Sequence, residues 1–265
     1  MRNTAHEEEY RGCKIILEYC QDIDSPREDD NLGTMACWHR RYNLGDVQPN
    51  EDAGEYLFDL ARQAVSVRYP EALLEKNRDA ILAKHYVILP LYLYDHSGIT
   101  MSTGAFSCPW DSGQVGIIHC SLDQARKNWM LPKDAPKDAG WDYMLDEWYD
   151  KAGKYIGEEQ KKLPPEQRIK VSLRDAVARS LKGEVQTYDD FLTGQVVGYI
   201  AEDPDGEEIS SCWGYFPDHD VPCSKEWDYP ISEAKSAIDS WCDKQATESA
   251  EAQHWAERDV ITPSP

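Results

Sequence analysis

The sequence predicts an α+β fold, with a largely antiparallel sheet and flanking helices in a single domain of 265 residues. Strand-like segments and helical periodicity alternate, but without the regular strand–helix–strand order that a parallel sheet requires. Two strand-like segments flank Pro204-Asp205-Gly206, which predicts a β-hairpin over 195–216 because proline fixes φ and glycine accepts a positive φ. A hydrophobic fraction of 41% with nine tryptophans is sufficient for a core. Trp213 is expected in this core, with the wall of a pocket as the alternative.

Further strands and helices are predicted along the N-terminal half of the chain. The short, apolar, β-branched segment Cys13–Cys20 predicts a first strand. Apolar residues at helical spacing predict a helix over Asp52–Val67, and Pro70 suits the first turn of a second helix that continues to Lys84. The apolar run Tyr86–Tyr94 predicts a strand, in which Pro90 indicates an edge position or a bulge.

Two strands, Ile99–Thr103 and Gln114–Cys120, are expected beside that run, followed by a short helix that Ser121 caps. Residues 132–165 are rich in lysine and aspartate and indicate a surface insertion of helical character. One apolar face predicts a long helix over Ser172–Leu192, which Gly194 is placed to end. A last helix is expected over 231–257, with 258–265 as a flexible tail.

The net charge of −21 disfavours binding to nucleic acid or to an anionic membrane, because both are polyanions. It favours a basic partner, although an acidic solvated surface is the alternative. The sequence contains neither a signal-peptide pattern nor the roughly 20 apolar residues that span a bilayer. With eight cysteines and no C-x-x-C motif, we expect a soluble cytoplasmic protein with free thiols.

No common catalytic or cofactor motif is present, so P-loop, dinucleotide-binding, α/β-hydrolase and zincin enzymes are poorly supported. The cofactor therefore stays unknown. Metal content also stays open, because ligand types are present but no His pair at i, i+4 fixes a geometry. His119 alternates out of a strand and is expected to be a packed or a surface histidine. The residues of ligand type are His39, Asp46, Asp95, His96, Asp111 and His119.

Polar residues gather densely over Leu89–Gly116, directly after an apolar strand, where scaffolds often present functional side chains. Asp95 or Asp111 could orient His96 as a general base. A thiolate–imidazole pair of Cys108 with His96 is a further possibility, against the alternative of a cysteine packed under the loop. The catalytic candidates are His96, Asp111 and Cys108.

The cationic cluster His39-Arg40-Arg41 could grip a carboxylate or a phosphate with two guanidinium groups. The alternative is that these arginines neutralise acids such as Asp29, Asp30 and Asp46. Trp110 offers a flat face for stacking, and the loop around it supplies hydrogen-bonding groups. The ligand-binding candidates are His39, Arg40, Arg41, Tyr94, Asp95, Ser97, Trp110, Ser112 and Gln114.

Four blocks of the chain resemble an uncharacterised family of hypothetical proteins from tailed phages, plasmids and their bacterial hosts. The blocks are SPREDDNLGTMACWHRRYNLGD, LPLYLYDHSGITMSTGAFSCPWDSGQVG, EVQTYDDFLTGQVVGY and SCWGYF, which span most of Ser25–Phe216. The family has no assigned activity, so the resemblance implies a mobile-element setting and the cytoplasm of the host cell, but no site residue.

Three functions are therefore expected, in order. The first is a non-catalytic protein that binds a small anionic ligand or a basic host protein, with counter-defence as a candidate role. The second is a hydrolase or transferase that uses His96 and Asp111 with Cys108 or a metal. The third is a DNA mimic that occupies a DNA-binding protein with its acidic surface. The first depends on the three polar segments, with Arg40, His96 and Asp111, converging in space.

Overall fold

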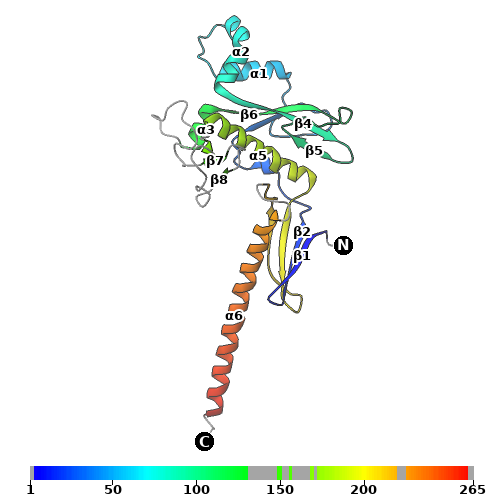
Figure 1. Ribbon diagram of the computed structural model, residues 1–265, viewed down its shortest axis with the longest axis vertical. Coiled ribbons are helices and arrows are strands. Elements are labelled where there is room, and N and C mark those ends of the chain that lie inside the picture. The colour runs from blue at the N-terminus through cyan, green and yellow to red at the C-terminus, as the bar shows by residue number, and fades with distance from the viewer. Residues whose placement is uncertain are drawn as a thin grey trace. The chain divides into compact units, whose positions relative to one another are not determined.

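The computed structural model describes residues 3–130, 148–150, 155–156, 168–169, 172–219 and 225–261. The fold is α+β, as predicted, and all pairs between its named strands are antiparallel. The chain divides into two compact units (Figure 1). We call Met1–Asp24 with Thr193–Pro265 the terminal unit and Ser25–Leu192 the central unit.

The terminal unit is a four-stranded sheet in the order β1-β2-β10-β11, with helix α6 packed on one face. Ile15, Leu17 and Tyr199 of the sheet and Ala234 and Ile238 of the helix form its buried core. The elements are β1 Thr4–Tyr10, β2 Cys13–Tyr19, β10 Val197–Glu202, β11 Glu208–Tyr215 and α6 Asp228–Ile261.

The predicted hairpin is confirmed as β10 and β11. The side chain of Asp203 accepts hydrogen bonds from the backbone N–H groups of Asp205 and Glu207, both at 2.9 Å, and Gly206 takes a φ of +86°. The expectation that Trp213 lies in the core is wrong, because its side chain lies over Gly198 and the residue is 48% exposed. The last helix continues to Ile261, so residues 258–261 are helical, and 262–265 lie outside the described residues.

The central unit has a four-stranded sheet in the order β3-β6-β4-β5. Val177, Leu181 and Val185 of α5 pack on one face of this sheet (Figure 1). The hairpin of α1 and α2 forms a second core with Tyr86 and Ile88, which alternate to the opposite face. The elements are β3 Thr34–Cys37, α1 Ala53–Gln63, α2 Glu71–His85, β4 Tyr86–Asp95, β5 Ile99–Ser102, β6 Ser112–Ser121, α3 Leu122–Asn128 and α5 Leu173–Thr193, with a 3-10 turn at Pro26–Glu28.

Pro90 shows both features that its position in β4 predicts. Strand β5 pairs only with Tyr92–Asp95, so among the described strands β4 has a neighbour on one side only at Pro90. The register to β6 also shifts between Leu91 and Tyr92, which is a bulge or irregularity. A residue without an N–H group is tolerated at such a position.

The helix ends also follow the predicted chemistry. The hydroxyl of Ser121 accepts the N–H of Gln124 at 3.0 Å at the start of α3. Gly194, with a φ of +69°, follows the end of α5. The predicted insertion at 132–165 lies largely outside the described residues, which include only β7 Trp148–Asp150 and β8 Tyr155–Ile156 in that range. β7 pairs with β8 and with β9, Arg168–Ile169.

Gly116 gives a test of the packing between β3 and β6. A Cβ atom at this position would overlap the backbone carbonyl oxygen of Ala36, which β3 cannot move without losing its pairing. We expect Gly116→Ala to lower the free energy of unfolding by about 2 kcal/mol or more, the scale of overpacking in a core. Gly113→Ala on the same strand, where a Cβ meets open space, is the matched control and should change it by less than about 1 kcal/mol. Equal unfolding free energies of the two variants in urea titrations would contradict this account.

Candidate functional site

The three polar segments predicted from the sequence do converge, at one end of the central sheet. Strand β4 ends at Asp95 and β6 begins at Ser112, and the pairing of these strands places the two ends side by side. The backbone N–H of Asp95 donates to the carbonyl of Asp111 at 2.8 Å. The segment after β3 is held there by a hydrogen bond from the N–H of Trp38 to the carbonyl of Val115 at 2.7 Å.

Arg41 forms an ion pair with Asp95 at this end of the sheet. Tyr42 donates its hydroxyl to the same carboxylate at 3.4 Å, and the Arg41 guanidinium lies 5.2 Å from the centre of the Tyr42 ring. The His39 ring stacks on the Tyr42 ring, nearly parallel to it, and the two ring centres are 5.0 Å apart. Arg40 is exposed. The cationic cluster therefore faces the polar loops, but Asp95 already neutralises Arg41.

The three catalytic candidates also lie together. The Asp111 carboxylate is 3.5 Å from Nδ1 of His96 and 3.6 Å from the sulfur of Cys108. Ser112 donates its hydroxyl to the carbonyl of Cys108, which closes the loop. A carboxylate rather than an imidazole thus contacts the thiol, whereas a cysteine nucleophile is commonly activated by an adjacent histidine.

The remaining predicted residues have mainly local contacts. Ser97 has a φ of +61° in the turn between β4 and β5, where the N–H of His96 donates to the carbonyl of Gly98 at 3.0 Å. Tyr94 lies against the rings of His96 and Phe106. Gln114 is exposed, and its side chain donates to the carbonyl of Gly116 in its own strand.

A hollow of about 310 Å³ lies between these segments. Trp110, which is 92% exposed, and the acidic residues Asp95 and Asp111 are among the residues that line it. It is lined by His39, Leu93, Asp95, Trp110, Asp111, Ser112, Gly113 and Val115. Larger hollows of about 700 Å³ lie elsewhere in the unit, one of them lined by six carboxylates at the start of α1 and α2.

Among the described residues, no group of three or more His, Cys, Asp or Glu side chains is arranged to hold a metal ion. His119 is buried at 8% exposure, and its Nε2 shares a hydrogen bond of 2.9 Å with the hydroxyl of Tyr56. Burial lowers the pKa of His119 to about 4. Of the two expectations for this histidine, the packed one is confirmed.

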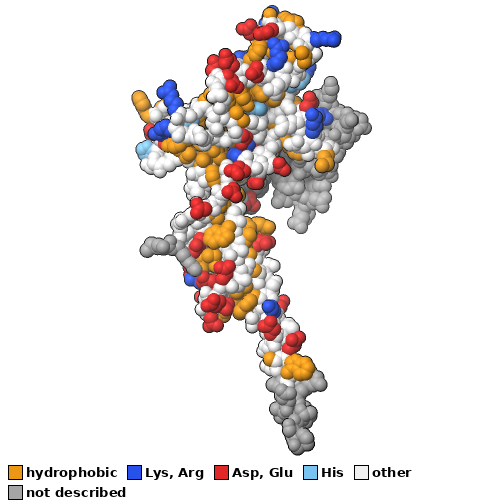
Figure 2. All heavy atoms as spheres, turned by 180° about the vertical axis from the view of Figure 1, so that it is seen from behind, with side chains coloured by type: hydrophobic (Ala, Val, Ile, Leu, Met, Phe, Trp, Pro, Cys, Tyr) orange, Lys and Arg blue, Asp and Glu red, His pale blue; other side chains and the backbone are white. Residues whose placement is uncertain are grey.

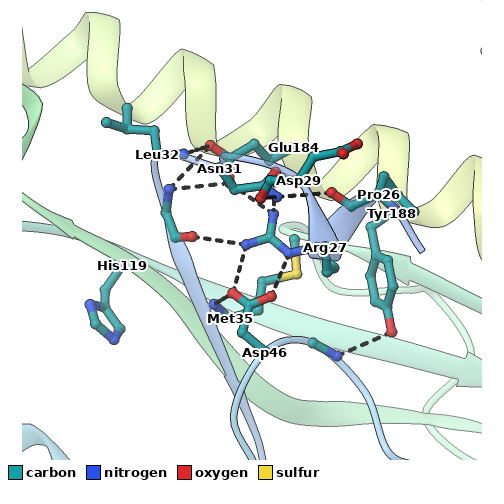
Figure 3. Close-up of polar contacts among 12 residues, drawn as sticks. Pro26, Arg27, Asp29, Asn31, Leu32, Met35, Asp46, His119, Glu184 and Tyr188 are labelled. Carbon is teal, nitrogen blue, oxygen red and sulfur yellow. Dashed lines mark hydrogen bonds and ion pairs between the residues drawn. The ribbon is translucent and has the colours of Figure 1, made fainter. Parts of the chain in front are cut away.

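The structure also shows a buried ionic network that the sequence analysis missed (Figure 3). The side chain of Arg27 is 4% exposed and uses all of its donors. It binds the Asp46 carboxylate with two nitrogens, at 2.8 and 2.6 Å, and the Glu184 carboxylate at 2.9 Å. The other acceptors are Asn31 at 3.0 Å and the carbonyl of Gly33 at 2.8 Å.

The two carboxylates of this network bind backbone as well. Glu184 on α5 accepts the N–H groups of Leu32 and Gly33, at 2.9 and 3.1 Å, and Asp46 accepts the N–H of Met35 at 2.8 Å (Figure 3). The network fixes the loop before β3 to α5. Asp46 therefore has Arg27 as its cationic partner, and not Arg40 or Arg41 as the alternative reading of that cluster expected.

Comparisons of the chain with protein-family models, with curated proteins and with solved structures find no significant match. No helix within the described ranges has the length and apolar character needed to cross a membrane.

Proposed function

We propose that the chain is a non-catalytic binding protein whose central unit receives a basic segment of a partner protein in the hollow beside Trp110. The observation that carries the proposal is the 92% exposure of Trp110 at a hollow that two acidic residues, Asp95 and Asp111, also line. An indole ring left in water loses the free energy that its burial would provide. Tryptophan is also enriched among the residues that dominate binding energy at interfaces.

The charges at the hollow favour a cationic group over an anionic one. Asp95 neutralises Arg41, while the Asp111 carboxylate contacts a histidine and a thiol. The whole chain carries −21, so its long-range field repels anions and attracts basic proteins. A lysine or arginine side chain could lie over the Trp110 ring and approach Asp111, because cations are attracted to the face of an indole. A small anionic ligand, also expected from the sequence, has less support.

The resemblance to proteins of tailed phages and plasmids suggests that the partner is a host protein and that counter-defence is the setting. All seven described cysteines are free thiols, which fits the reducing cytoplasm of the host cell that we propose as the place of action.

Trp110→Ala tests the proposal. We expect this variant to weaken binding of the partners that the wild-type chain retains from a host lysate by about 30-fold or more, the scale of an interfacial hot spot. The fold should be intact, because the ring makes little contact with the rest of the chain. Trp255→Ala on α6, where the residue is 59% exposed, is the matched control and should retain the same partners. Retention of an identical set of partners by Trp110→Ala, measured by quantitative mass spectrometry, would refute the role of the hollow.

The enzymatic alternative is favoured by one observation, the contact of Asp111 with both His96 and Cys108. Such a site would need Cys108 to react as a nucleophile. Rapid alkylation of Cys108 by iodoacetamide at neutral pH, and its loss in His96→Gln, would support the enzyme. Alkylation no faster than that of the exposed Cys212 would support the binding protein.

A further inference from the structure

Strand β11 lies at one edge of the terminal sheet, and β10 is its only partner among the described strands. Five of its eight residues are exposed, namely Glu208, Ser211, Cys212, Trp213 and Gly214. The outer side of an edge strand presents backbone N–H and C=O groups that are not paired within the sheet. Such a row of groups can accept a further extended segment.

The two edges of this sheet differ in their protection against pairing. Strand β1 at the other edge carries three consecutive glutamates, of which Glu7 pairs with Lys14 and Glu8 with Lys235, both at 2.7 Å. Charged side chains are a common device against edge-to-edge association. In contrast, Ile209–Tyr215 contains no charged residue and no proline. The β11 edge therefore lacks the protection that the β1 edge has.

Trp213 adds a contact surface beside the same edge. Tyr199 and Ala201 face α6, so Gly198, one position before Tyr199, faces the opposite side of the sheet. The Trp213 ring occupies the space above Gly198, which a Cβ atom would fill. Since the residue remains 48% exposed, its ring is available to a side chain of an added strand.

The charge of the terminal unit decides which occupant fits. The unit contains 22 acidic and seven basic residues, a net charge of −15, against −6 for the larger central unit. Figure 2 shows acidic side chains spread over the sheet and α6 of this unit. Pairing of β11 with a second copy would bring two such units together, and like charges repel. A segment rich in lysine or arginine is attracted instead.

We propose that the β11 edge accepts an extended basic segment of a partner protein as an additional antiparallel or parallel strand. Backbone hydrogen bonds would supply the affinity, Trp213 would contact an apolar or cationic side chain, and Glu207 and Glu208 would attract the basic residues. This surface is separate from the hollow beside Trp110 and does not depend on the function proposed for it.

The test uses the full chain and a synthetic peptide of alternating valine and lysine, as long as β11. We expect the peptide to slow hydrogen exchange about tenfold at those amides of β11 that do not pair with β10. Two control peptides share its length. One has glutamate in place of lysine, and the other is N-methylated at every residue, so that neither of its edges has a backbone N–H donor. Neither should protect these amides.

Protein variants then separate this site from the hollow. Glu207→Lys with Glu208→Lys should weaken peptide binding about tenfold, whereas Trp110→Ala should leave the β11 protection unchanged. Protection by the N-methylated peptide, or no protection of β11 by the lysine peptide at millimolar concentration, would overturn the proposal. Dimer formation in sedimentation experiments, together with slow hydrogen exchange of these β11 amides without any peptide, would also overturn the proposal. The occupant of the edge would then be a second copy of the chain.

Discussion

Arg27→Ala is expected to lower the free energy of unfolding of the central unit by about 3–5 kcal/mol, the scale for removing one partner of a buried ion pair. The substitution removes the cationic partner of the Asp46 and Glu184 carboxylates, although these side chains are only 22% and 13% exposed. A buried charge without its counter-ion pays a desolvation cost that the remaining backbone N–H donors offset only in part. Burial disfavours the charged form of Arg27, but the two carboxylates outweigh it and raise the pKa of its guanidinium above the usual value.

Arg27→Lys separates charge from geometry. Lysine keeps the positive charge, but a single ammonium group cannot reproduce the planar fork that reaches Asp46 with two nitrogens. We therefore expect Arg27→Lys to lower the free energy of unfolding, but by less than Arg27→Ala does.

Arg78→Ala is the matched control for both variants. Arg78 pairs with Asp79, whose side chain is 84% exposed, and an ion pair in such a setting contributes about 0–1 kcal/mol. Urea unfolding followed by circular dichroism gives all three values. A loss for Arg27→Ala that is no larger than that for Arg78→Ala would show that the network of Figure 3 contributes no more than a surface pair.

The elements predicted well are those whose signal is local. Apolar periodicity identified β2 and α5, and the turn chemistry of Pro204 to Gly206 identified the hairpin. Strand β1 was missed because TAHEEEY has no apolar alternation, and its register depends on pairing with β2. Trp213 was assigned to the core because tryptophan is usually buried, whereas the glycine that receives its ring lies on another strand.

The candidate site shows the same division. Dense polar residues at strand ends were enough to predict that the segments around Arg41, Asp95 and Asp111 meet. Their charge balance was not predictable, because the partner of Arg41 lies 54 positions away. Arg27 was missed for the same reason, since its acidic neighbours in sequence are not its partners, and Glu184 lies 157 positions away. A sequence lists charges, but only the fold pairs them.

Acidification from pH 6.5 to 4 is expected to lower the free energy of unfolding of the central unit by about 3 kcal/mol through His119 alone. The pKa of His119 falls from an ordinary value of 6.5 to about 4 in the folded chain, mainly because the side chain is buried. Between these two values the unfolded chain binds a proton that the folded chain excludes. The contribution of His119 to the free energy of unfolding is therefore complete above pH 6.5 and is lost as the pH decreases towards 4.

The environment of the imidazole explains why it stays neutral. Its ring lies between those of Tyr56 and Tyr86, at 5.7 and 6.1 Å, and the pKa of each tyrosine is raised by burial, so both remain uncharged near neutral pH. Asp46 is the charged group that acts on the ring in the opposite sense and raises its pKa, but this effect is smaller than that of burial. A second proton on His119 would thus be a charge placed between two aromatic rings with no adjacent counter-ion among the described residues.

His119→Gln tests this directly, because glutamine can keep the hydrogen bond to Tyr56 but does not titrate. We expect the unfolding free energy of the variant, measured in urea at a series of pH values, to change by about 3 kcal/mol less than that of the wild type between pH 6.5 and 4. His96→Gln, at a side chain that is 64% exposed, corrects for the loss of one histidine. Glu8 and Asp239, whose pKa values are lowered by ion pairs, act at lower pH and cancel in the difference. If the curves of wild type and His119→Gln run parallel, His119 must gain a proton without cost in the folded chain, and the packing of α1 on the sheet around it must be looser than the structure shows.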